Sequence, residues 1–192
     1  MTSFTIIGTG NMGSAIGGIL AAGGNDVSHV TKEQLGAAPA LGDVVILAVP
    51  YGALADIVAT AGADLDGKVV VDITNPLDFE TFDSLVVPVG SSAAAELQSQ
   101  LPSSKVLKAF NTTFAATLTG KQLGGLPTTV LIAGDDADAK RALAAAVTAG
   151  GLAAIDAGSL ARAHELEALG FLQLTLAAAD KISWTGGFAV AR

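Results

Sequence analysis

The sequence predicts an α/β protein of the Rossmann type, with a doubly wound, mostly parallel sheet and a long C-terminal helix. Three observations predict this class. Short runs rich in Val, Ile and Leu alternate with helical stretches along the chain, as they do in βαβ units. Several of these runs, such as residues 44–49, are apolar without alternation, which is typical of strands covered by helices on both faces. A glycine-rich turn joins the first run to the first helical stretch.

Each predicted strand is a short branched run bounded by turn residues, and helical stretches lie between such runs. The predicted strands are residues 4–7, 27–30, 44–49, 69–73, 106–110 and 129–133, with 152–155 as a candidate seventh. The predicted helices are residues 11–22, 52–61, 93–101, 137–149 and 161–182. Asp135, Asp136 and Asp138 are suited to cap the helix that begins near Ala137, and Ser159 is suited to cap the last helix, because their side-chain oxygens can accept from free helix N–H groups.

The connection after the second strand is unusually short. Only thirteen residues, 31–43, separate Val30 from Val44, and they include Pro39. A Rossmann half normally places a helix, a further strand and another helix there. We therefore predict that the usual third strand is missing, that residues 27–30 lie at a sheet edge, and that residues 31–41 hold one short helix or an irregular connection.

The turn after the first strand has the glycine spacing of a dinucleotide-binding loop. It reads Gly8-Thr9-Gly10-Asn11-Met12-Gly13. In that pattern the first glycine makes the tight turn, the second lets backbone N–H groups approach a pyrophosphate, and the third lets helix and strand pack closely. The anion would lie at the helix N-terminus, where unpaired N–H groups favour negative charge. The alternative is that the glycines have a purely structural role in the turn. Because the turn lies between a buried strand and a helix, we favour dinucleotide binding.

The end of the second strand indicates which dinucleotide is bound. An acidic residue there selects NAD, whereas basic or small polar residues accommodate the 2′-phosphate of NADP. Ser28, His29 and Lys32 offer donors, while Asp26 lies at the start of the strand and the next carboxylate is Glu33. We therefore predict NADP(H), the alternative being that these are ordinary solvated residues of an edge strand.

Composition limits the remaining possibilities. A chain of 192 residues fits one domain with a short appendage, predicted as an NADP-binding domain over 1–158 and a C-terminal helix and tail over 159–192 in the same compact unit. The net charge of −8 argues against nucleic acid as a partner. The chain has no cysteine and two histidines, so no metal site is expected. No apolar stretch suits a membrane span or a signal peptide, and a cytoplasmic location is expected.

Five segments that carry a family resemblance are spread in order along the chain: residues 5–13, 43–50, 71–77, 108–112 and 156–160. Together they resemble the NADP oxidoreductases that depend on coenzyme F-420, a deazaflavin. The wider group includes the ferric-reductase domains of certain membrane proteins. One departure concerns the tip of the second strand, where the family usually has Arg directly after Ser and this chain has His29.

The resemblance implies roles for residues at three strand ends, all at the carboxyl edge of the sheet. The set comprises Ala48, Val49, Pro50, Tyr51, Asn75, Pro76, Asn111 and Thr112. The first four would lie where the cofactor crosses from adenosine to nicotinamide. Asn75 and Pro76 would flank the nicotinamide ribose or ring, and Asn111 and Thr112 would face the carboxamide or the acceptor.

Three functions remain open from the sequence. The leading hypothesis is hydride transfer between NADP(H) and a deazaflavin or flavin, which requires placement of the two rings more than an acid or base. No catalytic residue is therefore assigned. The second is reduction of a small carbonyl or imine, with His164, Tyr51 or Thr112 as proton donor. The third is a non-catalytic NADP(H)-binding module. The last helix is expected to cover the sheet and to form a homodimer contact.

Overall fold

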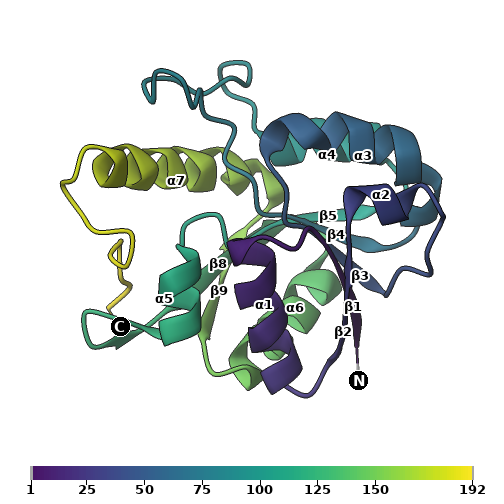
Figure 1. Ribbon diagram of the computed structural model, residues 1–192, viewed down its shortest axis with the longest axis horizontal. Coiled ribbons are helices and arrows are strands. Elements are labelled where there is room, and N and C mark those ends of the chain that lie inside the picture. The colour runs from purple at the N-terminus through teal and green to yellow at the C-terminus, as the bar shows by residue number, and fades with distance from the viewer. Residues whose placement is uncertain (1, 192) are drawn as a thin grey trace.

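Seven strands form one sheet in the computed structural model, which describes residues 2–191 (Figure 1). Their order is β2-β1-β3-β4-β5-β8-β9, and every neighbouring pair is parallel except β5 with β8. These strands are β1 (Ser3–Ile7), β2 (Asp26–Val30), β3 (Val44–Leu47), β4 (Val69–Asp72), β5 (Lys105–Lys108), β8 (Thr129–Gly134) and β9 (Ala153–Gly158). A small hairpin of β6 (Gln122–Leu123) and β7 (Leu126–Pro127) stands apart from the sheet.

Helices cover both faces of the sheet. One face carries α1 (Asn11–Ala22), α5 (Ala115–Gly120) and α6 (Ala137–Ala149). The other carries α2 (Lys32–Leu35), α3 (Leu54–Ala61), α4 (Ala93–Gln100) and the start of α7 (Ala163–Ala178). The 3₁₀ turns are η1 (Tyr51–Ala53), η2 (Gly62–Leu65) and η3 (Leu160–Arg162). Within residues 2–191, no helix is long and apolar enough to cross a bilayer.

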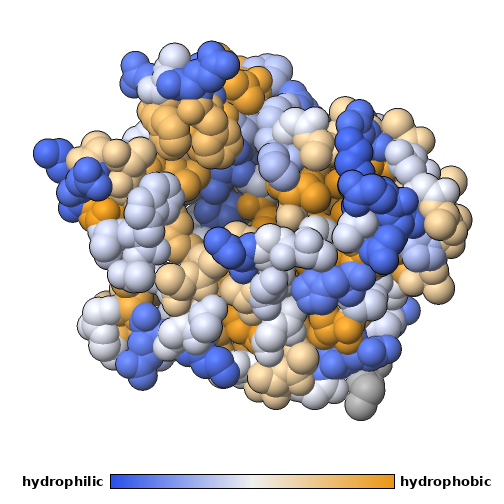
Figure 2. Space-filling view, viewed as in Figure 1, coloured by the Kyte–Doolittle hydropathy of each residue, from blue (hydrophilic) through white to orange (hydrophobic). Residues whose placement is uncertain are grey.

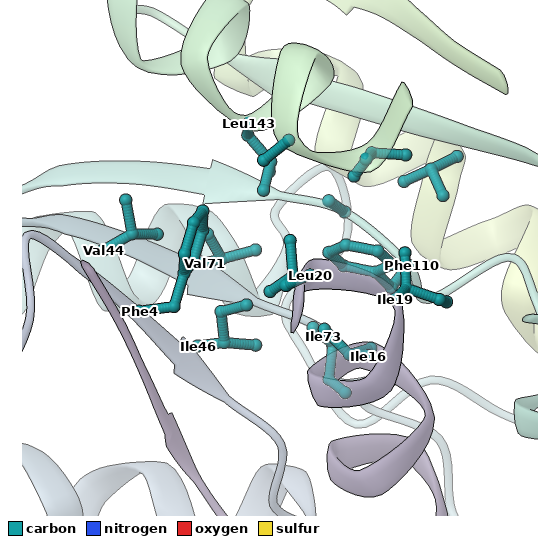
Figure 3. Close-up of a cluster of buried hydrophobic side chains, with 14 of the residues drawn as sticks. Phe4, Ile16, Ile19, Leu20, Val44, Ile46, Val71, Ile73, Phe110 and Leu143 are labelled. Atoms are coloured by element: carbon teal, nitrogen blue, oxygen red, sulfur yellow. The ribbon is translucent and has the colours of Figure 1, made fainter. Parts of the chain in front are cut away.

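The core is divided into two apolar clusters, one on each side of the sheet. Figure 3 shows the first, where Phe4 and Ile46 of the strands meet Leu20 of α1 and Leu143 of α6. The second lies between the opposite strand faces and α2, α3 and α4. Because the central strands bury side chains on both faces, they need the unbroken apolar runs that the sequence contains.

Strand β2 lies at the edge of the sheet, next to β1 alone. The prediction of a missing third strand is therefore confirmed. The connection to β3 contains the four-residue helix α2. Thr31 caps that helix: its hydroxyl accepts from the N–H of Gln34, whose side chain accepts in return from the N–H of Thr31. This reciprocal capping box satisfies N–H groups that the short helix would leave unpaired.

Several boundaries differ from the predictions. Strands β3, β4 and β5 end at Leu47, Asp72 and Lys108, so the last one or two residues of each predicted run belong to the loops beyond. The last helix is Ala163–Ala178 rather than 161–182. Ser159 precedes η3 without a side-chain capping bond, whereas Asp136 caps α6 as predicted, accepting from Ala139 N at 2.8 Å. Helix α5 and the β6–β7 hairpin were not predicted.

Candidate functional site

The glycine turn has the geometry that its spacing predicts. Gly8 has φ of +118°, and a Cβ there would collide with the carbonyl oxygen of Ala48. A Cβ on Gly13 would collide with the carbonyl oxygen of Gly8, whereas a Cβ on Gly10 would meet nothing within 4 Å. Gly10 is the N-cap of α1 and supplies no capping side chain. The start of the helix is therefore open to an anion.

A cavity of about 360 Å³ begins at this turn and extends across the carboxyl ends of β3 and β4. Figure 2 shows it as a hollow near the middle of the face, above the start of α1 in the view of Figure 1. Its volume is within the usual range for ligand pockets. The lining residues are Gly10, Asn11, Met12, Ala48, Val49, Pro50, Tyr51, Ile73, Thr74, Asn75, Phe79 and Leu174. Most of the predicted site residues at the start of α1 and in the loops after β3 and β4 are thus brought together.

Behind the cavity, two asparagines join the ends of β4 and β5. Asn75 Nδ2 donates to the carbonyl of Asn111 at 2.9 Å, and Asn111 Nδ2 donates to Asn75 Oδ1 at 2.9 Å and to the carbonyl of Leu166 at 2.8 Å. Helix α7 crosses this pair at Gly170, where a Cβ would collide with Asn75 Oδ1. Asn111 therefore supports the cavity wall through Asn75 and does not itself line the cavity.

A buried ion triad lies beside the asparagines. Lys108 Nζ is 2.8 Å from Asp72 Oδ2 and 2.8 Å from Glu167 Oε1, and the side chains are 0–1% exposed. Lys108 also donates to the carbonyl of Thr74 at 2.5 Å, and Glu167 accepts from Ala93 N at 2.9 Å. Burial raises the pKa of the Glu167 carboxyl, while Lys108 acts in the opposite direction.

The triad ties β4, β5, α4 and α7 together at the sheet edge that carries the cavity. None of the three residues is among the site residues predicted from the sequence. The sequence does contain one signal for the triad, which is Lys108 inside an otherwise apolar run. A lysine buried in a strand needs an oppositely charged partner, so its position indicates a buried ion pair.

The second strand brings fewer of the predicted residues to its tip. Ser28 and His29 lie within β2, which ends at Val30. The hydroxyl of Ser28 is 3.0 Å from that of Thr5, and the ring of His29 lies over Gly17 of α1. Only Lys32 follows the tip, where its Nζ is 2.6 Å from Asp56 Oδ2 in an exposed ion pair.

Comparisons with known proteins agree with this geometry. The model of the family described as "NADP oxidoreductase coenzyme F420-dependent" matches residues 28–76, from β2 to just past the end of β4. The F420-dependent NADP reductase of Methanocaldococcus jannaschii is 33% identical over 149 residues, which cover 76% of this chain and 66% of that protein. The chain belongs to this family.

One solved structure and a second curated relative are also similar to this chain. A crystal structure from Arthrobacter sp. FB24, described as a candidate F420-dependent NADP reductase, superposes over the whole of both chains with a TM-score of 0.86 and 26% identity. The rat Metalloreductase STEAP3 is 37% identical over 105 residues, and the match covers 55% of this chain and 20% of that protein. The chain is thus an NADP-dependent oxidoreductase by family, and it spans about two thirds of the methanogen reductase.

The cavity has few side chains that could donate or accept a proton during a reaction. Tyr51 is the only titratable side chain among the lining residues, and its hydroxyl donates to Glu96 Oε2 at 2.7 Å. Burial, helped by Glu96, raises the pKa of Tyr51 to about 12. His164 Nδ1 is 3.0 Å from the carbonyl of Ser91, and neither His164 nor Thr112 lines the cavity. Pro76 also lies outside the lining set.

Proposed function

We propose that this protein transfers hydride between NADP(H) and a deazaflavin coenzyme, with a flavin as the second candidate partner. The observation that carries the proposal is the cavity that joins the open N-terminus of α1 to the ends of β3 and β4. The cavity runs in the direction a dinucleotide needs, from the backbone amides that would bind the diphosphate to a largely apolar end lined by Ile73, Phe79 and Leu174. In open α/β sheets, ligands bind at this carboxyl edge.

The residues at the apolar end of the cavity suit a reaction that depends on how two rings are placed relative to each other. When bound, the nicotinamide supplies the hydride or receives it. Phe79 and Leu174 offer apolar surface for planar rings, and Asn75 is held in place by Asn111. Hydride transfer between two rings requires close approach more than proton donation. The absence of a His, Asp, Glu or Lys side chain from the residues that line the cavity therefore favours this reaction over reduction of a carbonyl or imine.

A binding and turnover series tests the proposal. Affinities for NADPH and NADH are measured on the purified protein, followed by loss of nicotinamide absorbance with coenzyme F-420, with a flavin and with small carbonyl compounds. We expect tight NADPH binding and turnover with the deazaflavin. Turnover with carbonyls alone would support the second hypothesis of the sequence analysis. Binding without turnover on any acceptor would indicate the third function, a non-catalytic NADP(H)-binding module.

We further propose that two copies associate through α7. Leu172 on this helix is 49% exposed, although all four of the other leucines of α7 are at least partly buried. Light scattering should give the mass of a dimer for the wild type and of a monomer for Leu172→Glu. A monomeric wild type would contradict the proposal. The cytoplasmic location and the lack of a nucleic-acid partner stay predictions from composition.

A further inference from the structure

We infer that Thr74 binds the carboxamide group of the nicotinamide, an inference that rests on the function proposed above. Thr74 follows the end of β4 and lines the cavity, yet the residue is almost fully buried, with 4% of its surface exposed. Its hydroxyl oxygen has no hydrogen-bond partner among residues 2–191. A buried hydroxyl without a partner is costly, so such a group on a residue that lines a ligand cavity points to a polar ligand atom that completes it.

The backbone of Thr74 is fixed on both sides by the ion triad. Its N–H donates to Asp72 Oδ1 at 2.8 Å, and its carbonyl accepts from Lys108 Nζ at 2.5 Å. Asp72 and Lys108 are themselves fully buried and paired at 2.8 Å. The main-chain groups of Thr74 are therefore satisfied, and the hydroxyl is the polar group that remains for a ligand.

The neighbouring residues that could bind the carboxamide either lie outside the cavity lining or are bonded to each other. The resemblance to the family gives the carboxamide or the acceptor to Asn111 and Thr112, but neither residue lines the cavity. Asn111 Oδ1 is also buried without a partner, yet its Nδ2 is bonded to Asn75 and Leu166 behind the wall. Asn75 lines the cavity with its amide oxygen and amide nitrogen both bonded to Asn111.

The chemistry of the ligand follows from the surroundings. A threonine hydroxyl can donate to a carbonyl oxygen or accept from an amide N–H, and a carboxamide offers both. The flanking side chains Ile73 and Phe79, and Leu174 of α7, are apolar, as suits the face of a ring. The nicotinamide ribose also carries polar groups, so the experiment must separate ring from ribose.

The test compares NADPH with 2′-phospho-ADP-ribose, which keeps both riboses and the diphosphate and lacks the nicotinamide. Thr74→Val removes the hydroxyl and keeps the branched shape, and Thr74→Ser keeps the hydroxyl. We expect Thr74→Val to bind NADPH about tenfold more weakly, the loss of one hydrogen bond to a buried group, and to bind 2′-phospho-ADP-ribose as the wild type does. Thr74→Ser should retain most of the NADPH affinity.

Thermal unfolding without ligand provides the folding control. Because Thr74→Val deletes an unpartnered polar group, its Tm should equal or exceed that of the wild type. An unchanged NADPH affinity in Thr74→Val would overturn the inference alone, and equal weakening of both ligands would assign the hydroxyl to the ribose instead. A wild type that binds neither ligand would overturn the proposed function, and the inference with it.

Discussion

The two ends of the proposed dinucleotide site are built in opposite ways. At the end formed by Thr74 and Asn75, a lysine and two carboxylates are buried together and the asparagines of two strands hold each other. At the end formed by the tip of β2, the charged group is Lys32, whose ion pair with Asp56 lies in the open, with side chains 56% and 64% exposed. The first end has fixed geometry, and the second has a solvated charge on a flexible stem.

This difference matches what each half of a dinucleotide requires. Hydride transfer loses rate steeply when the reacting atoms are misplaced, so the nicotinamide end needs a rigid frame. Recognition of a 2′-phosphate needs only a nearby cation, and solvent and salt weaken the attraction between the two charges. We therefore expect strict placement at the nicotinamide end and a modest preference for NADP over NAD at the other.

The largest effect is expected at the buried triad. Lys108→Met leaves Asp72 and Glu167 facing each other without a cation, and breaking a buried pair in this way costs about 3–5 kcal/mol of folding free energy. Denaturant unfolding measures the loss. Lys105→Met is the matched control, since it changes the same residue type on the same strand where the side chain is 48% exposed; it should leave stability nearly unchanged. Equal stability of the two variants would contradict the description of the triad.

The glycine turn separates cofactor binding from folding. A Cβ on Gly10 would meet no atom within 4 Å and its φ is an ordinary −71°, so Gly10→Val should fold normally. The added side chain occupies the space of the diphosphate, and NADPH affinity should fall by about a hundredfold, or ~2.7 kcal/mol. Gly18→Val, on the same helix with equally open space, is the control. Titration calorimetry that gives similar affinities for both variants would refute the placement of the diphosphate.

The sheet was predictable because its signals are local. Apolar runs for buried strands, a glycine spacing for the turn and a short connection for the missing strand can each be read within a few residues. Strand ends were less predictable. The run 106–110 continues to Phe110, yet β5 stops at Lys108 because the chain turns, with Phe110 at φ of +64°. Such a left-handed residue is held by its tertiary surroundings, which local pattern does not reveal.

The site was predictable in part for the same reason. The residues of the glycine turn and of the ends of β3 and β4 were identified from motif and resemblance, and most of them line one cavity. The triad was missed because Asp72, Lys108 and Glu167 come from three separate segments. Ser28 and His29 stay predictions. They lie within β2, and an edge strand carries polar side chains along its length, so polarity alone does not locate the tip.

The crossing of α7 over the asparagine pair depends on the lack of a side chain at Gly170. Gly170→Ala should destabilise the fold by about 1–3 kcal/mol through overpacking, although alanine favours a helix. It should also lower kcat, because the displaced Asn75 lines the cavity. Gly18→Ala provides the opposite control: its space is open, and the change should stabilise α1 by up to about 1 kcal/mol. A Gly170→Ala protein as stable and active as the wild type would show that α7 can shift freely.

The smallest effect is expected at the exposed end. Lys32→Glu should weaken NADPH by about fivefold, as is usual for a surface charge, and NADH much less, because NADH lacks the 2′-phosphate. The difference should shrink as salt is added. Lys181→Glu makes the same change of overall charge at an exposed position beyond α7, so subtracting its effect removes the general repulsion between an acidic protein and an anionic ligand. If Lys32→Glu then weakens both cofactors equally, the charge after β2 does not select the phosphate, and the two ends of the site differ in structure without differing in specificity.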